Sequence, residues 1–337
     1  MKRLIAFAAA ATVAACQSMT PASSAPESFT FAVIGDLGYA TSQEPMVDNV
    51  MADLNATSPL AFVVHVGDLG STFVGSCRDN FWARRFAQFQ ASVHPFIYTP
   101  GDNEWTDCHA KSAGAFDPLE RLAALRAMFF QGGQSLGKRR IALIRQSDNP
   151  ARAKFRENVR WSQEGITFIT LHVVGSNNGR GRNAEGDAEF HERTNANIEW
   201  MRQSFAHARA TGSRALMIFQ QGNIFPGITP YPEPASVPTD GFDEIRDVLE
   251  EETIRYGKPV VLVHGDSHYF RIDKPLGVRE VKAAGASFTT IAPSIENFTR
   301  VEGFGQPNHH WLRVTVDDGE NVFTIRQRIV PANIQKR

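Results

Sequence analysis

The sequence FTFAVIGD at residues 29–36 combines aromatic and β-branched residues and ends in Gly-Asp, the pattern of a buried strand that runs into a turn. The pattern returns twice, because an apolar run at residues 60–66 ends at Gly67-Asp68 and a shorter run at residues 95–98 is followed by Gly101-Asp102. Helices are expected between these strands, at residues 45–54 and 80–92. Strands that alternate with helices predict an α/β fold.

The rest of the chain continues this alternation and then changes character. Further strands are predicted at residues 166–174, 214–219 and 259–263, and helices at residues 188–207 and 243–256. The last predicted strands, at residues 288–291, 311–316 and 322–329, have no helices between them. That spacing favours antiparallel neighbours in a second sheet layer. Because no internal repeat or linker divides the chain, residues 29–333 are expected to form a single domain.

The overall charge of the chain is close to neutral. It has 337 residues, of which 42% are hydrophobic, with 35 basic and 36 acidic side chains. Proteins that bind nucleic acid through its phosphates usually carry a clustered basic excess, so no nucleic-acid binding is expected. The densest basic run, Lys138-Arg139-Arg140, is interpreted as solvated surface.

The start of the chain predicts export. A basic Met1-Lys2-Arg3 precedes an apolar run at residues 4–15, which is the layout of a signal peptide and is shorter than the roughly 20 residues that span a bilayer. The segment at residues 13–16 resembles a bacterial lipobox, so we expect residues 1–15 to be removed and Cys16 to be lipidated. An ordinary signal peptide with an incidental Cys16 is the alternative. Residues 16–28 would then be a tether.

The predicted location is the cell envelope, through a lipid anchor. Gln17 follows Cys16, and a non-acidic residue there resembles the pattern of lipoproteins sorted to the outer membrane, facing the periplasm or the cell surface. Once Cys16 is lipidated, Cys77 and Cys108 remain. An even pair of cysteines in an oxidising compartment favours a disulfide, with two free buried thiols as the alternative.

Acidic residues recur at predicted strand ends. The four motifs are GDLG at residues 35–38, GDLG at 67–70, GDNE at 101–104 and HGDSH at 264–268. A single Gly-Asp pair is common in turns, whereas this ordered set is much rarer. Because ligands collect at the carboxyl ends of strands in open α/β sheets, these acids are expected to converge.

The succession of motifs resembles the calcineurin-like metallophosphoesterases, including the purple acid phosphatases, whose motifs read GD, GD, GNHE, a lone His and GHxH. The resemblance covers residues 29–272. It implies a four-layer α-β-β-α sandwich of two mixed sheets flanked by helices, and a site with two metal ions. Asp36 would bind the first ion and Asp68 would bridge both. Asp102 takes the place of the motif asparagine, and Asn103 that of the catalytic histidine.

The later motifs supply the remaining implied ligands. The lone histidine corresponds best to Gln221, with Gln220 as the alternative, while Asp266 replaces one histidine of the last motif and His268 is retained. The second ion would then be held only by oxygen atoms, which suit Mg²⁺, Mn²⁺ or Ca²⁺. The first ion would have His268 beside two carboxylates, so Fe or Zn are options there.

The expected activity is hydrolysis of a phosphoester substrate. Two metal ions clamp the attacking and leaving oxygens and lower the pKa of a bound water. Asn103 cannot donate a proton, and loss of a positioned general acid lowers rates about 10²- to 10⁴-fold. Glu104, His109 and His264 are candidate substitutes, and Arg180 or Arg182 would reach a substrate phosphate unless their loop is only solvated surface. The alternative function is a degenerate site that binds metal or an envelope partner without turnover.

Overall fold

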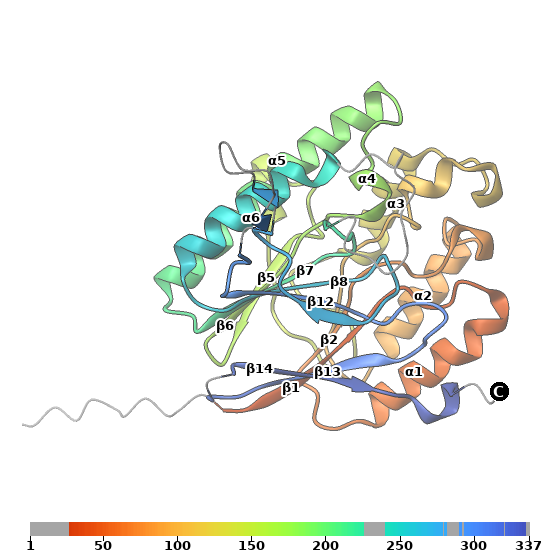
Figure 1. The fold of residues 1–337 in the computed structure, drawn as a ribbon. Coiled ribbons are helices and arrows are strands. Elements are labelled where there is room, and N and C mark those ends of the chain that lie inside the picture. The colour runs from red at the N-terminus through yellow and green to blue at the C-terminus, as the bar shows by residue number, and fades with distance from the viewer. Residues whose placement is uncertain are drawn as a thin grey trace, which may run out of the picture.

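Two mixed β-sheets and their flanking helices make up the computed structural model, which describes residues 27–225, 240–278, 280–281, 290–291, 293–319 and 321–334 (Figure 1). The α/β class predicted from the sequence is therefore confirmed. The predicted signal peptide, the tether up to residue 26 and Cys16 lie outside the described residues. Within the described part of the chain, no helix has the length and apolar character that crossing a membrane requires.

The first sheet joins the two ends of the chain. Its strands are β1 (Phe29–Ile34), β2 (Val63–His65), β3 (Phe96–Tyr98), β13 (Trp311–Val316) and β14 (Phe323–Arg328), in the order β14-β13-β1-β2-β3. The first three strands are parallel, and β13 pairs antiparallel with both β1 and β14. Side chains alternate along β1, so that Phe31 and Val33 enter one core and Ala32 and Ile34 another.

The second sheet comes from the middle of the chain. Its strands are β4 (Ile144–Arg145), β5 (Val159–Gln163), β6 (Ile166–Thr170), β7 (Ala215–Phe219), β8 (Val260–His264), β12 (Phe298–Glu302) and β9 (Arg271–Asp273), given in spatial order. The four strands from β6 to β12 are parallel. Two short strands, β10 (Glu280–Val281) and β11 (Thr290–Ile291), pair with each other.

Three large apolar clusters among the described residues hold these elements together. One lies between the sheets and contains Phe31 of β1, Phe168 of β6 and Leu312 of β13. The second joins the first sheet to α1 (Glu44–Ala56), α2 (Asp79–Ala91) and α3 (Pro118–Phe129). The third joins the second sheet to α5 (Ala184–Ala210) and α6 (Asp243–Tyr256). Each helix buries one apolar stripe, as Val47, Val50 and Leu54 do in α1.

The prediction for the last strands was wrong in part. Residues 311–316 and 323–328 are antiparallel strands, but they extend the sheet of β1 rather than forming a second layer. The second sheet instead uses β12, which the sequence analysis did not predict and which is parallel to β8. The predicted strand at residues 166–174 ends at Thr170, because the chain then leaves the sheet toward the single turn α4 (Gly175–Asn178).

Strand register brings the predicted motifs to one edge of the molecule. In the first sheet Ile34, His65 and Tyr98 are aligned across β1, β2 and β3. Asp36, Asp68 and Asp102 follow these strand ends within a few residues. The second sheet supplies the remaining predicted ligands, because β7 and β8 run parallel and end just before Gln221 and Asp266.

Candidate metal centre

Four of the six predicted ligands sit on strained backbone where the strands end. Asp36, Asp68, Asp266 and His268 have φ angles of 53°, 54°, 77° and 61°, in the left-handed region. Non-glycine residues in sparsely populated regions cost on the order of 1–3 kcal/mol each and cluster at functional sites. Asp and His are among the residues that tolerate this region best. The turns therefore aim the four side chains at a common point despite the conformational cost.

One half of the site is formed by Asp36, Asp68 and His268. Each offers a ligand atom, and these atoms all lie within 4.8 Å of one another. His268 Nε2 is 3.7 Å from Asp36 Oδ1. His268 Nδ1 donates to the Gln306 carbonyl oxygen at 3.0 Å, which fixes the ring and leaves the lone pair of Nε2 directed toward the carboxylates.

The other half contains Asp102, Asp266 and Gln221. Gln221 Nε2 donates to Asp102 Oδ1 at 3.1 Å and reaches Asp266 Oδ1 at 3.5 Å. Gln221 Oε1 accepts the Gly175 N–H at 2.6 Å, so its carbonyl is turned away from the carboxylates. The two halves adjoin, because the Asp266 N–H donates to Asp36 Oδ1 at 3.1 Å. All six predicted ligands thus come together, with the Gln221 amide in a donor rather than a ligand orientation.

Tyr39 is a member of the site that the sequence analysis missed. Its hydroxyl donates to Asp68 Oδ2 and lies 3.4 Å from Asp36 Oδ1 and 3.2 Å from His268 Nε2. Asn103 Nδ2 donates to the same hydroxyl at 3.1 Å. The sequence signals Tyr39 only by its place three residues after Asp36. Tyrosines are common in turns, so this spacing alone does not identify a site residue.

Burial and mutual repulsion disfavour the charged forms of these carboxyl groups. Burial raises the pKa of Asp36 well above its ordinary value, and repulsion from Asp266 adds to the shift. The pKa of Asp68 is raised in the same way, by burial and then by repulsion from Asp102. For Asp102, burial followed by repulsion from Asp107 and Asp266 raises the pKa to about 8. A cation between these carboxylates would favour their charged forms and so offset the shifts.

The residues fit a divalent cation. Asp36 Oδ2 is fully buried and has no hydrogen-bond partner, which is rare for a buried acceptor. A side chain at Gly265 would approach this oxygen to 1.9 Å, so the backbone there leaves room only for Gly. Among the described residues, no Lys or Arg pairs with Asp36, Asp68 or Asp102 within 4.0 Å. Clustered oxygen donors without a protein counter-charge are the donor set of hard divalent ions.

Asn103 and Glu104 have different roles in this geometry. Asn103 Nδ2 donates to Asp68 Oδ2 at 2.8 Å, so its amide faces the centre of the site. Glu104 is fully buried, and its carboxylate accepts the N–H groups of Leu69 and Gly101, the latter at 3.0 Å. Glu104 therefore ties together the loops that carry Asp68 and Asn103, and its contacts are those of a structural group rather than of a general acid.

Three of the other four candidates for acid or substrate roles are engaged elsewhere. His264 is fully buried and its Nδ1 donates to the Gly265 carbonyl oxygen at 2.7 Å. His109 is exposed, and its Nδ1 donates to the Thr106 carbonyl oxygen at 2.8 Å. Arg180 forms an ion pair with Asp240 at 2.8 Å. For Arg182, burial lowers the pKa of the guanidinium.

The predicted disulfide between Cys77 and Cys108 is confirmed. Cys77 Sγ and Cys108 Sγ lie 3.5 and 3.8 Å from the Asn103 carbonyl oxygen. The Ser76 hydroxyl donates to the same oxygen at 2.7 Å. The disulfide thus packs behind the loop that presents Asn103 and helps to fix it.

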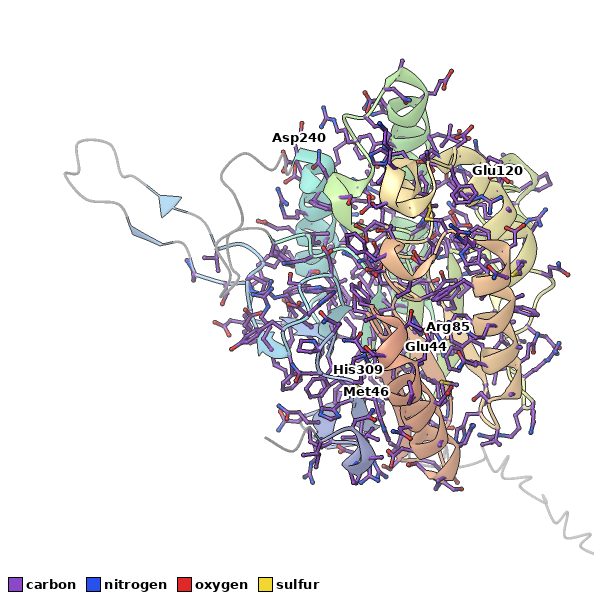
Figure 2. All side chains as sticks on the ribbon, turned by 90° about the vertical axis from the view of Figure 1, so that its right-hand side faces the viewer. Glu44, Met46, Arg85, Glu120, Asp240 and His309 are labelled. Carbon is purple, nitrogen blue, oxygen red and sulfur yellow. A yellow bond between two sulfur atoms is a disulfide. The ribbon has the colours of Figure 1, made fainter. Side chains whose placement is uncertain are left out.

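Two further contacts support the site from behind. Arg85 of α2 pairs with Glu44 of α1 through two bonds of 2.9 Å, and its Nε donates to the Leu69 carbonyl oxygen at 2.9 Å (Figure 2). The Gly38 N–H donates to His309 Nε2 at 3.2 Å. The loops after Asp36 and Asp68 are therefore anchored to two helices and to the last part of the chain.

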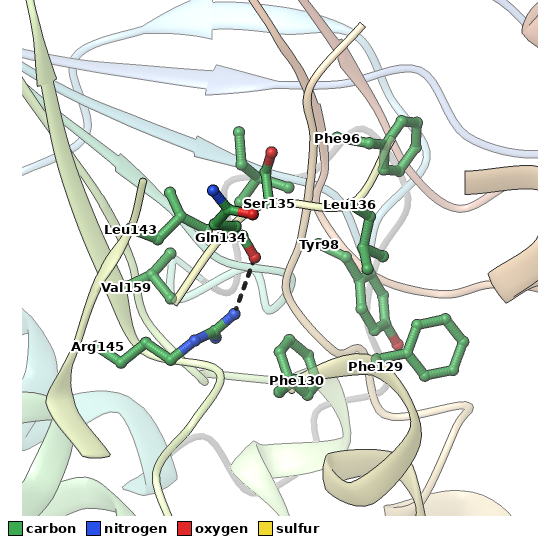
Figure 3. A pocket seen from close by; sticks show the side chains of 11 residues that line it. Phe96, Tyr98, Phe129, Phe130, Gln134, Ser135, Leu136, Leu143, Arg145 and Val159 are labelled. Carbon is green, nitrogen blue, oxygen red and sulfur yellow. Dashed lines mark hydrogen bonds between the residues drawn. The ribbon is translucent and has the colours of Figure 1, made fainter. Parts of the chain in front are cut away.

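The small cavity beside β3 is not part of this site. It has a volume of about 20 Å³, enough for roughly one water molecule, and its lining includes Phe96, Tyr98 and Phe130 (Figure 3). The Arg145 side chain at its edge donates to the Gln134 carbonyl oxygen at 3.3 Å. None of the candidate ligands lines it.

Comparison with known proteins gives a fold but no family. No family model matches the chain, and no curated protein matches it. Among solved structures, it is similar to GAP50, described as the anchor in the inner membrane complex of Plasmodium, with a TM-score of 0.50. The match covers 91% of this chain and 86% of that chain at 9% sequence identity. At that identity the likeness concerns the fold alone.

Proposed function

We propose that this chain is a metal-dependent phosphoesterase of the calcineurin-like kind, built on that family's four-layer α-β-β-α sandwich. The observation that carries the proposal is the convergence of strand-end acids with His268 around Asp36 Oδ2, a buried oxygen without a partner. The packing is compatible with the four layers, because one apolar cluster separates the sheets and helices cover the outer face of each.

The ligand assignment follows the two halves of the site. Asp36, Asp68 and His268 would hold the first ion, with the Tyr39 hydroxyl close enough to join them. Asp68, Asp102 and Asp266 would hold the second, together with Gln221 once its amide turns its oxygen inward. An oxygen-only set favours Mg²⁺, Mn²⁺ or Ca²⁺ at the second position, and imidazole at the first admits Fe or Zn.

The chemistry divides between the ions and the side chains. When bound, two divalent ions would clamp phosphate oxygens and lower the pKa of a water nucleophile. Asn103 would donate a hydrogen bond to the phosphoryl group once its Nδ2 releases the Tyr39 hydroxyl, since both N–H groups of this amide are engaged, one by Tyr39 and one by Asp68. An amide cannot protonate a leaving group, so substrates with good leaving groups would react best.

We also propose that the protein works at the cell envelope through a lipid on Cys16. The chain enters the first sheet at Phe29, and Asp36 follows the other end of the same strand. The site therefore lies at the end of β1 opposite to the end at which the described chain enters the sheet. A substrate would then reach it from the side away from the anchoring membrane.

A second function, binding without turnover, is favoured by two observations. Asn103 stands where the resemblance implies a general acid, and an amide cannot protonate a leaving group. The similar solved structure is described as an anchor in a membrane complex. In this alternative the chain would bind an envelope partner on the same fold.

The deciding experiment assays the purified protein with a chromogenic phosphodiester and a phosphomonoester in Mg²⁺, Mn²⁺, Ca²⁺ and Zn²⁺. Turnover that Asp68→Asn abolishes and Asp318→Asn leaves intact supports the enzyme, because Asp318 is an exposed acid outside the site. Binding of metal with no turnover for any ion and substrate supports the second function.

A further inference from the structure

A left-handed turn lies directly beside the oxygen-only half of the site. Ser176, Asn177 and Asn178 have φ angles of 50°, 54° and 57°, so three consecutive non-glycine residues adopt the left-handed conformation. Single residues visit this region, but successive ones are unusual because each places Cβ close to a carbonyl oxygen. Strain of this kind persists only where the surrounding structure over-determines it.

The side chains of Asn177 and Asn178 hold the turn in place through hydrogen bonds. Asn178 Oδ1 accepts the Val174 N–H at 3.3 Å, and Asn178 Nδ2 donates to the Gly241 carbonyl oxygen at 3.1 Å. Asn177 Oδ1 accepts the Gly241 N–H at 3.0 Å. Both side chains are buried, and Asn is the residue after Gly that tolerates this backbone best. Ser176 contributes to none of these bonds.

Ser176 instead contacts a candidate ligand. Its Oγ donates to Asp102 Oδ2 at 2.8 Å, while Gln221 Nε2 donates to Asp102 Oδ1. The preceding Gly175 is packed so closely that a Cβ there would lie 2.8 Å from Asp102 Oδ2 and 2.5 Å from Asp266 Oδ1. The turn therefore forms the wall against which both carboxylates rest.

We infer that Ser176 is a positioning residue for the second metal ion. Its hydroxyl holds one oxygen of Asp102, so that the carboxylate plane is set before an ion arrives. The left-handed backbone is the conformation that points Oγ at this oxygen, and the asparagines hold it there. Removing a residue that hydrogen-bonds to a metal ligand typically weakens metal affinity about 10- to 100-fold. The inference rests on the proposed two-metal function and extends it to a residue outside the resemblance.

Two variants separate positioning from plain stability. Ser176→Gly removes the hydroxyl and relieves the backbone strain, whereas Ser176→Ala removes the hydroxyl and keeps the strain. In calorimetric titrations of the full chain with Mn²⁺, both variants should bind the second ion about 10-fold more weakly and the first ion unchanged. Their melting temperatures should diverge, with the Gly variant the more stable. Ser176→Asn, which keeps a donor and tolerates the backbone, should recover most of the affinity.

The controls make the outcomes distinct. Ser112→Ala removes an exposed hydroxyl from another turn and should change neither Mn²⁺ affinity nor stability. Wild-type Mn²⁺ affinity in both the Gly and Ala variants would overturn the inference alone. A loss of Mn²⁺ affinity confined to the less stable of the two variants would also overturn the inference, because Mn²⁺ affinity would then follow stability. A wild-type protein that binds no Mn²⁺ would overturn the proposed function together with the inference.

Discussion

Asn103 Nδ2 donates a hydrogen bond of 2.8 Å to Asp68 Oδ2, and the backbone N–H of Asn103 lies 3.3 Å from Asp68 Oδ1. Asn103, which would stand in place of a general acid in the proposed enzyme, thus donates to both oxygens of the proposed bridging ligand. This pairing links the position of the metal ions to the side chain that would face the substrate.

Replacing Asn103 tests whether the lack of a general acid limits the rate of hydrolysis. Asn103→His would supply a group able to protonate a leaving group, and should raise kcat for alkyl or phenyl phosphodiesters by up to about 100-fold. Nitrophenyl esters, which need less protonation, should gain little. The comparison requires kcat for both ester types in the wild type, in Asn103→His and in Asn103→Ala. An equal change for both types would argue against leaving-group protonation as the missing function.

Removing the bridging acid should be more damaging than removing a ligand of one ion. Asp68→Asn is expected to weaken the binding of both ions, and Asp36→Asn that of only the first, because the proposed assignment makes Asp68 the ligand shared between the two halves. Bound metal per chain, measured by elemental analysis after dialysis, reports the difference, with Asp318→Asn as the matched control. Small and equal losses in the two variants would contradict a shared ligand.

In the metal-free protein the carboxyl cluster should contribute less stability as the pH rises. The pKa of Asp102 is 3.8 ordinarily and about 8 in the folded chain, because of burial and the neighbouring acids, so the folded state binds the extra proton. The pKa values of Asp36 and Asp68 are raised in the same direction. The contribution of these carboxyl groups to stability therefore falls between about pH 4 and pH 8, because in that range the folded chain holds protons on them that the unfolded chain has released.

Thermal melts at pH 5 and pH 8 test the predicted direction of this change in stability. Buried histidines such as His65 and His264, whose pKa values burial lowers to about 3, act in the opposite direction, so wild type is compared with Asp102→Asn. Between pH 5 and pH 8 the metal-free wild type should lose more melting temperature than the metal-free variant, and Mn²⁺ should raise the wild-type melting temperature more at pH 8, because bound protons compete with the ion. An equal pH dependence in the two metal-free proteins would contradict the raised pKa of Asp102.

The disulfide should stabilise the fold and the site together. It joins residues 31 apart in sequence, and on the chain-entropy model such a loop contributes about 3.7 kcal/mol. Replacing Cys77 and Cys108 with Ser should lower the free energy of unfolding in urea by about that amount and weaken Mn²⁺ binding through the Asn103 loop. An unchanged urea midpoint would contradict the stabilising role.

Membrane attachment gives an independent test of the predicted lipid. Cys16→Ser should release the protein into the soluble fraction, since no other acylation site is predicted. Fractionation of cells that express each form measures this directly. A variant that stays with the membrane would count against the lipid anchor.

Much of the site followed from the order of Gly-Asp pairs after apolar strands. Parallel strands carry their carboxyl ends to one edge, so Asp36, Asp68 and Asp102 had to lie near one another once the α/β class was recognised. The return of β13 and β14 to the first sheet could not be predicted, because antiparallel pairing across nearly the whole chain leaves no local pattern. Tyr39 and Ser176 were missed for a related reason: their contacts depend on left-handed turns whose geometry the sequence does not specify.

The central claim is that two cations sit among these carboxylates. Anomalous diffraction from crystals grown with Mn²⁺ tests it most directly. We predict two peaks, one bounded by Asp36, Asp68 and His268 and the other by Asp68, Asp102 and Asp266. Full-length protein whose crystals show no peak at this edge of the sheets, with these carboxylates still hydrogen-bonded to Tyr39 and Gln221, would contradict the claim.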